Sequence, residues 1–257
     1  MARITDRTIL IVGASSGIGA EVARQLAGDG NRLVLTARRA PELARVAEEV
    51  RAAGSACLDL VADALDPRAA AEVVAAGVAE FGAIDVALLN AGQGPDMSMD
   101  RVSVADVARI MALNYDTVVN YLVPLIDRMG SQRHGGLIAH TNSLAGLMGI
   151  PRQGPYSAAK AAARTLIDAA RVELAPRGIR FTSIHPGFVA TRPHQRGRPA
   201  EALPDQSGAG RARHVVRALE REPAQAYFPW PTAALVRTLR TLPASVSAAV
   251  LRRLASP

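Results

Sequence analysis

Residues 8–19, TILIVGASSGIG, decide the fold of this 257-residue chain. The first five residues form a short, largely apolar run typical of a buried strand, and the rest is a Gly-x-x-x-Gly-x-Gly turn that opens the helical pattern Ile18–Gly28. Such glycines let the backbone turn tightly and approach a pyrophosphate, and the helix N-terminus offers amide donors. A glycine-rich turn without a ligand is the alternative. We interpret the turn as nucleotide-binding, through Gly13, Ser15, Ser16, Gly17, Ile18 and Gly19.

Short apolar runs alternate with helical patterns along the next 170 or so residues. Further buried strands are predicted at Leu33–Thr36, Ala56–Val61, Ile84–Leu89, Leu137–Thr141 and Ile179–Ile184, and helices at Pro41–Ala53, Pro67–Phe81, Val104–Met129 and Tyr156–Ala175. This alternation predicts an α/β fold, a single-domain Rossmann-type doubly wound parallel sheet with helices on both faces. Ligands of such sheets bind at the carboxyl ends of the strands.

The C-terminal third departs from the alternation. Residues 192–213 are rich in Pro, Gly and Arg, which is typical of either a mobile lid or a disordered loop, and we favour a substrate lid over 192–230. Within and after it we expect a helix at Arg213–Arg221, a short strand at Ala226–Phe228, and two basic amphipathic helices in 231–257, at Thr232–Leu242 and Ser245–Leu254. No internal repeat or second domain is visible, so we expect one domain over 1–257.

Composition excludes several classes of protein. The single cysteine, Cys57, cannot form an internal disulfide, and the N-terminus lacks a secretory signal, so we expect a cytoplasmic protein. No apolar run is long enough to span a membrane. Residues 191–257 hold 11 arginines and four acidic residues, whereas the remainder is balanced. The pI near 10.6 therefore describes a tail, and with 4% aromatic residues nucleic acid is not an expected partner. No metal site is predicted.

The second predicted strand ends in Thr36-Ala37-Arg38-Arg39. An NAD site usually has an acid about 20 residues after the glycines to bind the ribose 2′-hydroxyl, whereas arginine binds a 2′-phosphate. Two adjacent arginines can also be ordinary solvated surface. We interpret Arg38 and Arg39 as an NADP-binding pair, with NAD less favoured. After the third strand come Asp63 and Ala64; Asp63 either bonds the adenine amino group, which we favour, or caps the helix near Pro67.

Tyr156-Ser157-Ala158-Ala159-Lys160 is the strongest chemical signal. The i, i+4 spacing puts the phenol and the ammonium on one face of a helix. A nearby cation favours the phenolate and so lowers a pKa that is about 10 unperturbed, which makes Tyr156 a candidate proton donor. Lys160 is the only lysine of a chain whose other basic residues are all arginine. A chance pairing is the alternative.

Polar and small residues follow other strands at the same predicted edge. Ser143 can hold a carbonyl oxygen beside Tyr156 or cap the following turn, and Asn114 is predicted inside a helix despite its poor propensity, which suggests a hydrogen-bonding task. Further cofactor contacts are predicted at Asn90, Ala91 and Gly92, and at Pro186, Gly187, Val189 and Thr191.

These motifs resemble those of the short-chain dehydrogenase/reductase family over residues 8 to about 191. GASSGIG, NAG, Asn114, Ser143, YSAAK and PGFVAT occur in the family's order. The resemblance implies about seven parallel strands, a nicotinamide cofactor across the strand ends, and a catalytic tetrad of Asn114, Ser143, Tyr156 and Lys160. Val12 departs from the Thr that family members often carry before the first glycine.

We therefore predict NADP(H)-dependent interconversion of a carbonyl and an alcohol on an uncharged, apolar small molecule. The expected substrate contacts are Ser143, Leu144, Ala145, Tyr156 and Phe188. Alternatives are a catalytically silent NADP(H) sensor and an enzyme acting on a membrane-partitioned lipid or steroid-like substrate, with the basic tail on the membrane surface. The tail can equally pack on the body or in a subunit interface, and a homodimer or homotetramer is expected.

Overall fold

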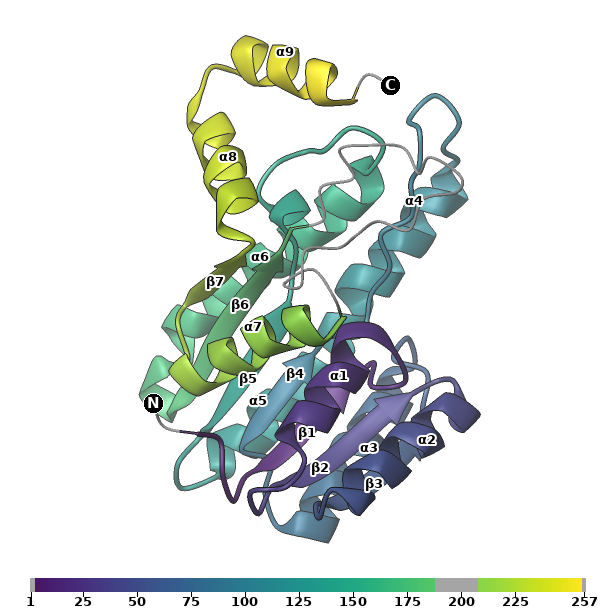
Figure 1. The fold of residues 1–257 in the computed structure, drawn as a ribbon, viewed down its shortest axis with the longest axis vertical. Coiled ribbons are helices and arrows are strands. Elements are labelled where there is room, and N and C mark those ends of the chain that lie inside the picture. The colour runs from purple at the N-terminus through teal and green to yellow at the C-terminus, as the bar shows by residue number, and fades with distance from the viewer. Residues whose placement is uncertain (1–2, 188–207, 256–257) are drawn as a thin grey trace.

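The computed structural model describes residues 3–187 and 208–255, which form one parallel sheet covered by helices (Figure 1). The strand order is β3-β2-β1-β4-β5-β6-β7. The strands are β1 Thr8–Val12, β2 Arg32–Ala37, β3 Ala56–Val61, β4 Val86–Leu89, β5 Gly136–Thr141, β6 Ile179–Pro186 and β7 Gln225–Phe228. Because β1 pairs with both β2 and β4, the order reverses there, and the predicted doubly wound sheet is confirmed.

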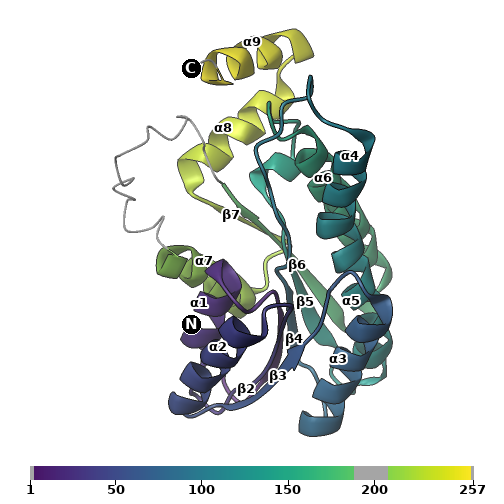
Figure 2. The same cartoon turned by 90° about the vertical axis from the view of Figure 1, so that its right-hand side faces the viewer.

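Helices cover both faces of the sheet, as Figure 2 shows. One face carries α1 Gly17–Leu26, α2 Ala40–Ala52 and α7 Gly208–Arg221, and the other carries α3 Pro67–Phe81, α5 Thr117–Ser131 and α6 Gly154–Glu173. Side chains alternate along each strand, so Ile9 and Ile11 pack against the first layer and Leu10 and Val12 against the second. This explains why the strands read as continuous apolar runs.

The predicted helix Val104–Met129 is wrong in one respect, because it is interrupted. α4, Val104–Met111, is followed by a π-helical turn at Ala112–Asp116 before α5 begins. Asn114 lies in that turn, and its side-chain amide donates to the carbonyl oxygen of Ile110 at 3.0 Å. Single π turns of this kind often occur at functional sites.

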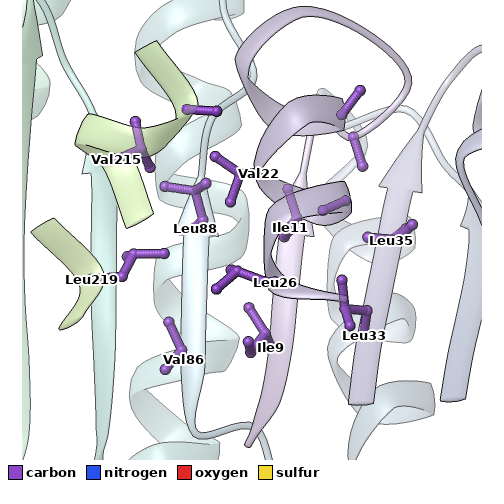
Figure 3. Packing of buried hydrophobic residues seen from close by; sticks show 14 of the residues in the cluster. Ile9, Ile11, Val22, Leu26, Leu33, Leu35, Val86, Leu88, Val215 and Leu219 are labelled. Carbon is purple, nitrogen blue, oxygen red and sulfur yellow. The ribbon is translucent and has the colours of Figure 1, made fainter. Parts of the chain in front are cut away.

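The predicted lid over 192–230 needs correction in its second half. The helix expected there is α7, and its Val215 and Leu219 are buried against α1 and the sheet (Figure 3). The expected last strand is β7, which pairs with β6. Residues 208–228 therefore belong to the body because their apolar faces fill its core. The rest of the predicted lid, 192–207, lies outside the described residues.

Two further helices end the chain, α8 Trp230–Thr241 and α9 Ala244–Ala255, and the predicted break at Pro243 is confirmed. Figure 1 shows both in yellow beyond the end of β7. Within the described ranges, no helix is both long and apolar enough to cross a bilayer.

Candidate active site

A cleft of about 1450 Å³ runs along the carboxyl ends of the strands. It begins at the glycine-rich turn, passes the ends of β2 to β6, and reaches α8. Most of the predicted contact residues line it: Gly13, Ser15, Ser16, Gly17, Ile18, Arg38, Arg39, Asp63, Ala64, Asn90, Ala91, Gly92, Ser143, Leu144, Ala145, Tyr156, Lys160, Pro186 and Gly187. Phe188, Val189 and Thr191 fall outside the described residues.

The glycine-rich turn leaves space that a side chain would fill. Gly13 has a φ of +84°, and a Cβ on Gly19 would overlap the carbonyl oxygen of Gly13. Ser16, the residue preceding α1, makes no side-chain cap to the helix. The Ser16 side chain therefore leaves the first amides of α1 able to donate to a ligand in the cleft. A turn of this kind fits the pyrophosphate of a dinucleotide.

The end of β2 presents two guanidinium groups to the same part of the cleft. Arg39 donates to the hydroxyl oxygens of Ser16 at 2.7 Å and Ser15 at 3.1 Å. Arg38 lies 4.0 Å from the carboxylate of Asp63. Ala37, at the position where an acid would select NAD, is almost buried. Arg39 also pairs with Glu42 at 3.2 Å, so both guanidinium groups lie next to the phosphate-binding turn with a carboxylate partner each.

Asp63 does not cap the helix after β3. The residue that caps α3 is Asp66, which accepts from the amide of Arg68 at 2.8 Å. Asp63 instead accepts from the amide of Leu65 at 3.0 Å and faces the cleft beside Arg38. The capping alternative for Asp63 is thus excluded.

Tyr156 and Lys160 both line the cleft from the first half of α6. The Lys160 Nζ lies 5.8 Å from the centroid of the Tyr156 ring and donates to the carbonyl oxygen of Thr141 at 2.8 Å. The lysine side chain is buried, and burial lowers its pKa to about 7. An ammonium with that pKa gains and loses its proton near neutral pH.

The expected lowering of the Tyr156 pKa by Lys160 is wrong. Burial raises the pKa of the phenol above its ordinary value, and among the described residues the Ser143 side chain opposes this by lowering it. Desolvation disfavours the charge on both groups, so the Lys160 amine is only partly protonated beside the phenol at neutral pH. The residue that favours the phenolate in this structure is therefore Ser143.

Of the two roles that the sequence left open for Ser143, the structure shows the cap. The Ser143 hydroxyl accepts from the amide of Ala145 at 3.1 Å and so caps a 3₁₀ turn at Leu144–Gly146, and the same side chain lies near enough to Tyr156 to lower the pKa of the phenol. Sequence reasoning missed Asn142, whose Oδ1 accepts from the Ser143 amide at 2.7 Å and whose Nδ2 donates to the Lys160 carbonyl at 3.0 Å. Its position at the end of a buried strand was the available signal.

Asn114 lies on the other side of Lys160. Its Nδ2 donates to the Gln93 carbonyl at 2.9 Å, and its Oδ1 accepts from the Gln93 amide at 3.1 Å. A Cβ on Gly92 would lie 2.6 Å from Asn114 Oδ1 and 3.2 Å from Lys160 Nζ. The structure therefore brings Asn114, Lys160 and the loop after β4 together, and Gln93 is a second residue that sequence reasoning missed.

The terminal helices close the far end of the cleft. Leu235, Val236 and Leu239 of α8 and Leu251 of α9 line it. Val236 also packs with Leu144 in a small apolar cluster. The sequence left the tail on the body, in a subunit interface or on a membrane. In the structure, α8 packs on the body of the protein and adds an apolar wall to the cleft.

Comparison with known proteins places these features in context. The family model described as short chain dehydrogenase matches residues 7–202. An uncharacterized oxidoreductase of Myxococcus xanthus is 32% identical over 255 residues, covering 99% of this chain and 100% of that protein.

Two solved structures are similar as well. NAD⁺-bound xylitol dehydrogenase is 29% identical, with a TM-score of 0.69 over 73% of this chain and 72% of that one. An alcohol dehydrogenase from the archaeon Thermococcus sibiricus, complexed with 5-hydroxy-NADP, is 28% identical, with a TM-score of 0.74 over 86% of this chain and 95% of that one.

Proposed function

The chain belongs to the short-chain dehydrogenase family of NAD(P)-dependent oxidoreductases, and we propose that it uses NADP(H) to interconvert a carbonyl compound and an alcohol. The observation that carries the proposal is the arrangement of Ser143, Tyr156 and Lys160 in one cleft with the glycine-rich turn. A silent cofactor sensor would have no use for a proton donor beside that turn.

In the reductive direction, Ser143 and Tyr156 hold the substrate's carbonyl oxygen by donating hydrogen bonds. Bound NADPH supplies the hydride that reaches the carbonyl carbon. Tyr156 gives its proton to the oxygen, which becomes the alcohol hydroxyl. Lys160, with a pKa of about 7, returns a proton toward the phenol and bonds the nicotinamide ribose, and Asn114 anchors the path to solvent. The same groups act in reverse during alcohol oxidation.

The preference for NADP over NAD rests on the charge at the end of β2. Arg38 and Arg39 present two cations where Ala37 leaves no acid to bind a ribose 2′-hydroxyl. Arginine binds a phosphate through charge-assisted hydrogen bonds. The solved relatives bind NAD⁺ in one case and an NADP derivative in the other, so the preference is argued from these residues.

The substrate that we propose is uncharged and apolar beyond its reacting carbonyl. Leu144, Leu235 and Leu239 give the far end of the cleft hydrocarbon walls. Arg211 also borders the cleft, from α7. A lipid-like or steroid-like compound fits such walls. A homo-oligomer and a cytoplasmic location remain predictions.

Consumption of NADPH and NADH, measured on a panel of uncharged aldehydes and ketones, tests the proposal. We expect turnover with apolar ketones and a higher kcat/KM with NADPH. A flat trace on the whole panel with tight NADPH binding would favour the sensor. Carboxylate-bearing ketones are assayed beside this panel, and turnover confined to them would refute the substrate class.

A further inference from the structure

A row of three side chains leads from α8 to the backbone of Ser143. The guanidinium carbon of Arg237, on α8, lies 5.2 Å from the ring centroid of Tyr227 on β7. The Tyr227 ring stacks on His185 of β6 with centroids 4.7 Å apart and an interplanar angle of 20°. The His185 Nδ1 lies 3.2 Å from the carbonyl oxygen of Ser143. The family's predicted tetrad contains none of the three.

The protonation of His185 follows from its partner. A carbonyl oxygen only accepts hydrogen bonds, so the His185 Nδ1 carries the proton and donates a hydrogen bond to the Ser143 carbonyl oxygen. The ring is completely buried, and burial lowers its pKa to about 4, so His185 is neutral at ordinary pH. Among the described residues, its Nε2 has no hydrogen-bond partner. The hydrogen bond that the described residues give this buried ring is therefore the one to Ser143.

Tyr227 and Arg237 keep the imidazole ring in that orientation. The Tyr227 hydroxyl is held by Gln225, which fixes the ring plane against His185. Stacking a cation on the outer face of Tyr227 adds a further restraint. Both residues lie beyond residue 202, where the match to the family model ends. The row is therefore assembled partly by the segment that also walls the substrate end of the cleft.

We propose that His185 is a positioning residue for Ser143, held in place by Tyr227 and Arg237. Its hydrogen bond fixes the Ser143 carbonyl and so aims the Ser143 hydroxyl at Tyr156. The inference rests on the proposed function, since it gives Ser143 and Tyr156 their roles at the reacting oxygen. Asn142 accepts from the amide of the same residue, so both the amide and the carbonyl of Ser143 have side-chain partners.

Charged groups on α6 face His185 as well. Arg164 and Arg171 lower its pKa and Asp168 raises it, while Asp168 forms ion pairs with both arginines. The next strand contributes His140, which is buried and has a pKa well below its ordinary value. Burial remains the largest influence on the pKa of His185 and leaves the ring neutral across the working pH range. A pH effect of changing His185 therefore reports on the other titrating groups of the site, Tyr156 and Lys160, and the phenol titration described below separates the two.

The test compares His185→Leu with His185→Asn, because the Asn amide can donate from nearly the position of Nδ1 and Leu cannot. We expect His185→Leu to lower kcat about tenfold, as the loss of one hydrogen bond at the reaction centre would do. The Kd for NADPH stays unchanged. The Asn variant stays within about threefold of the wild type.

The pH profile separates positioning from a general loss of structure. Ser143 lowers the pKa of Tyr156, so weakening that bond raises the pKa. The midpoint of kcat/KM for alcohol oxidation, which needs the phenolate, therefore moves to higher pH in His185→Leu and returns in His185→Asn. An unmoved midpoint in the Leu variant, or equal losses in both variants, overturns the proposal.

A second pair covers the case in which His185→Leu does not fold. Tyr227→Leu removes the ring that stacks on His185, whereas Tyr227→Phe keeps it. We expect a higher phenol pKa only in the Leu variant. Ultraviolet difference titration against a Tyr156→Phe background measures that pKa without any substrate. If the wild type reduces no carbonyl compound, the proposed function fails, while this titration still decides whether the row acts on Tyr156.

Discussion

The two ends of the cleft are built from different parts of the chain. The cofactor end consists of the glycine-rich turn, the strand ends and the Tyr156–Lys160 face of α6, all within the residues 7–202 that the family model matches. The end that we propose for the substrate is walled by α8 and α9, which lie beyond that match.

This difference reflects how strictly each end depends on residue type. At the cofactor end, a Cβ on Gly19 would overlap backbone, and the buried Lys160 donates to the Thr141 carbonyl. At the substrate end, Leu235 and Leu239 need only be apolar and of suitable size. The first end can therefore be recognised from motifs, and the second is free to differ between enzymes with different substrates.

Replacing Tyr156 with Phe should have the largest effect. The variant keeps the ring but removes the proton donor, so we expect kcat to fall by about 10²- to 10⁴-fold on every substrate. NADPH binding should persist, because the nucleotide contacts lie elsewhere in the cleft. Loss of turnover together with an unchanged Kd for NADPH would support separate parts of the cleft for proton donation and for nucleotide binding. Unchanged turnover would show that another group donates the proton.

The buried amine makes the cofactor end sensitive to pH. Lys160 has a folded pKa of about 7 against 10.5 for the free side chain, so between these values the unfolded chain binds more protons. Stability should therefore rise with pH across this window, by about 2 kcal/mol between pH 7 and 9. Lys160→Met should abolish the rise.

Urea unfolding at the two pH values measures this difference. Arg253→Gln, on exposed α9, is the control and should keep the wild-type rise. A rise of the same size in Lys160→Met would assign the proton to another group.

Much of this architecture was predictable because its signals are local. The six strands and the opening turn follow from runs of apolar residues and from glycine spacing, and the structure confirms the sheet. Tyr156 and Lys160 could be paired because four residues on a helix make one turn.

The predictions that were wrong concern features that depend on burial, and burial cannot be read directly from the sequence. The phenol pKa was expected to follow the nearest charge, but desolvation of Tyr156 and Lys160 dominates it. The Pro- and Arg-rich composition near residue 200 suggested a lid as far as 230, yet Val215 and Leu219 fill the core. The π turn at Asn114 depends on a contact with Gln93, 21 residues earlier in the chain.

The two arginines after β2 test cofactor choice at the first end. Arg38→Gln should raise the Kd for NADPH about tenfold and leave the Kd for NADH unchanged, because only NADPH has a 2′-phosphate to lose its partner. Arg45→Gln, on the exposed surface of α2, is the matched control. Equal weakening of both cofactors by Arg38→Gln would mean that the residue supports the turn and not the phosphate.

The smallest effect is expected at the substrate end. Leu235 is 44% exposed and lines the cleft, whereas Leu242 is 38% exposed and is not among the cleft residues. Leu235→Ser should raise KM for a bulky apolar ketone about fivefold, as partial loss of an apolar contact would do, and leave the Kd for NADPH unchanged. Leu242→Ser should change neither the KM nor the Kd. Equal KM values for the two variants would therefore show that α8 does not contact the substrate, and the functional part of the cleft would then be its cofactor end.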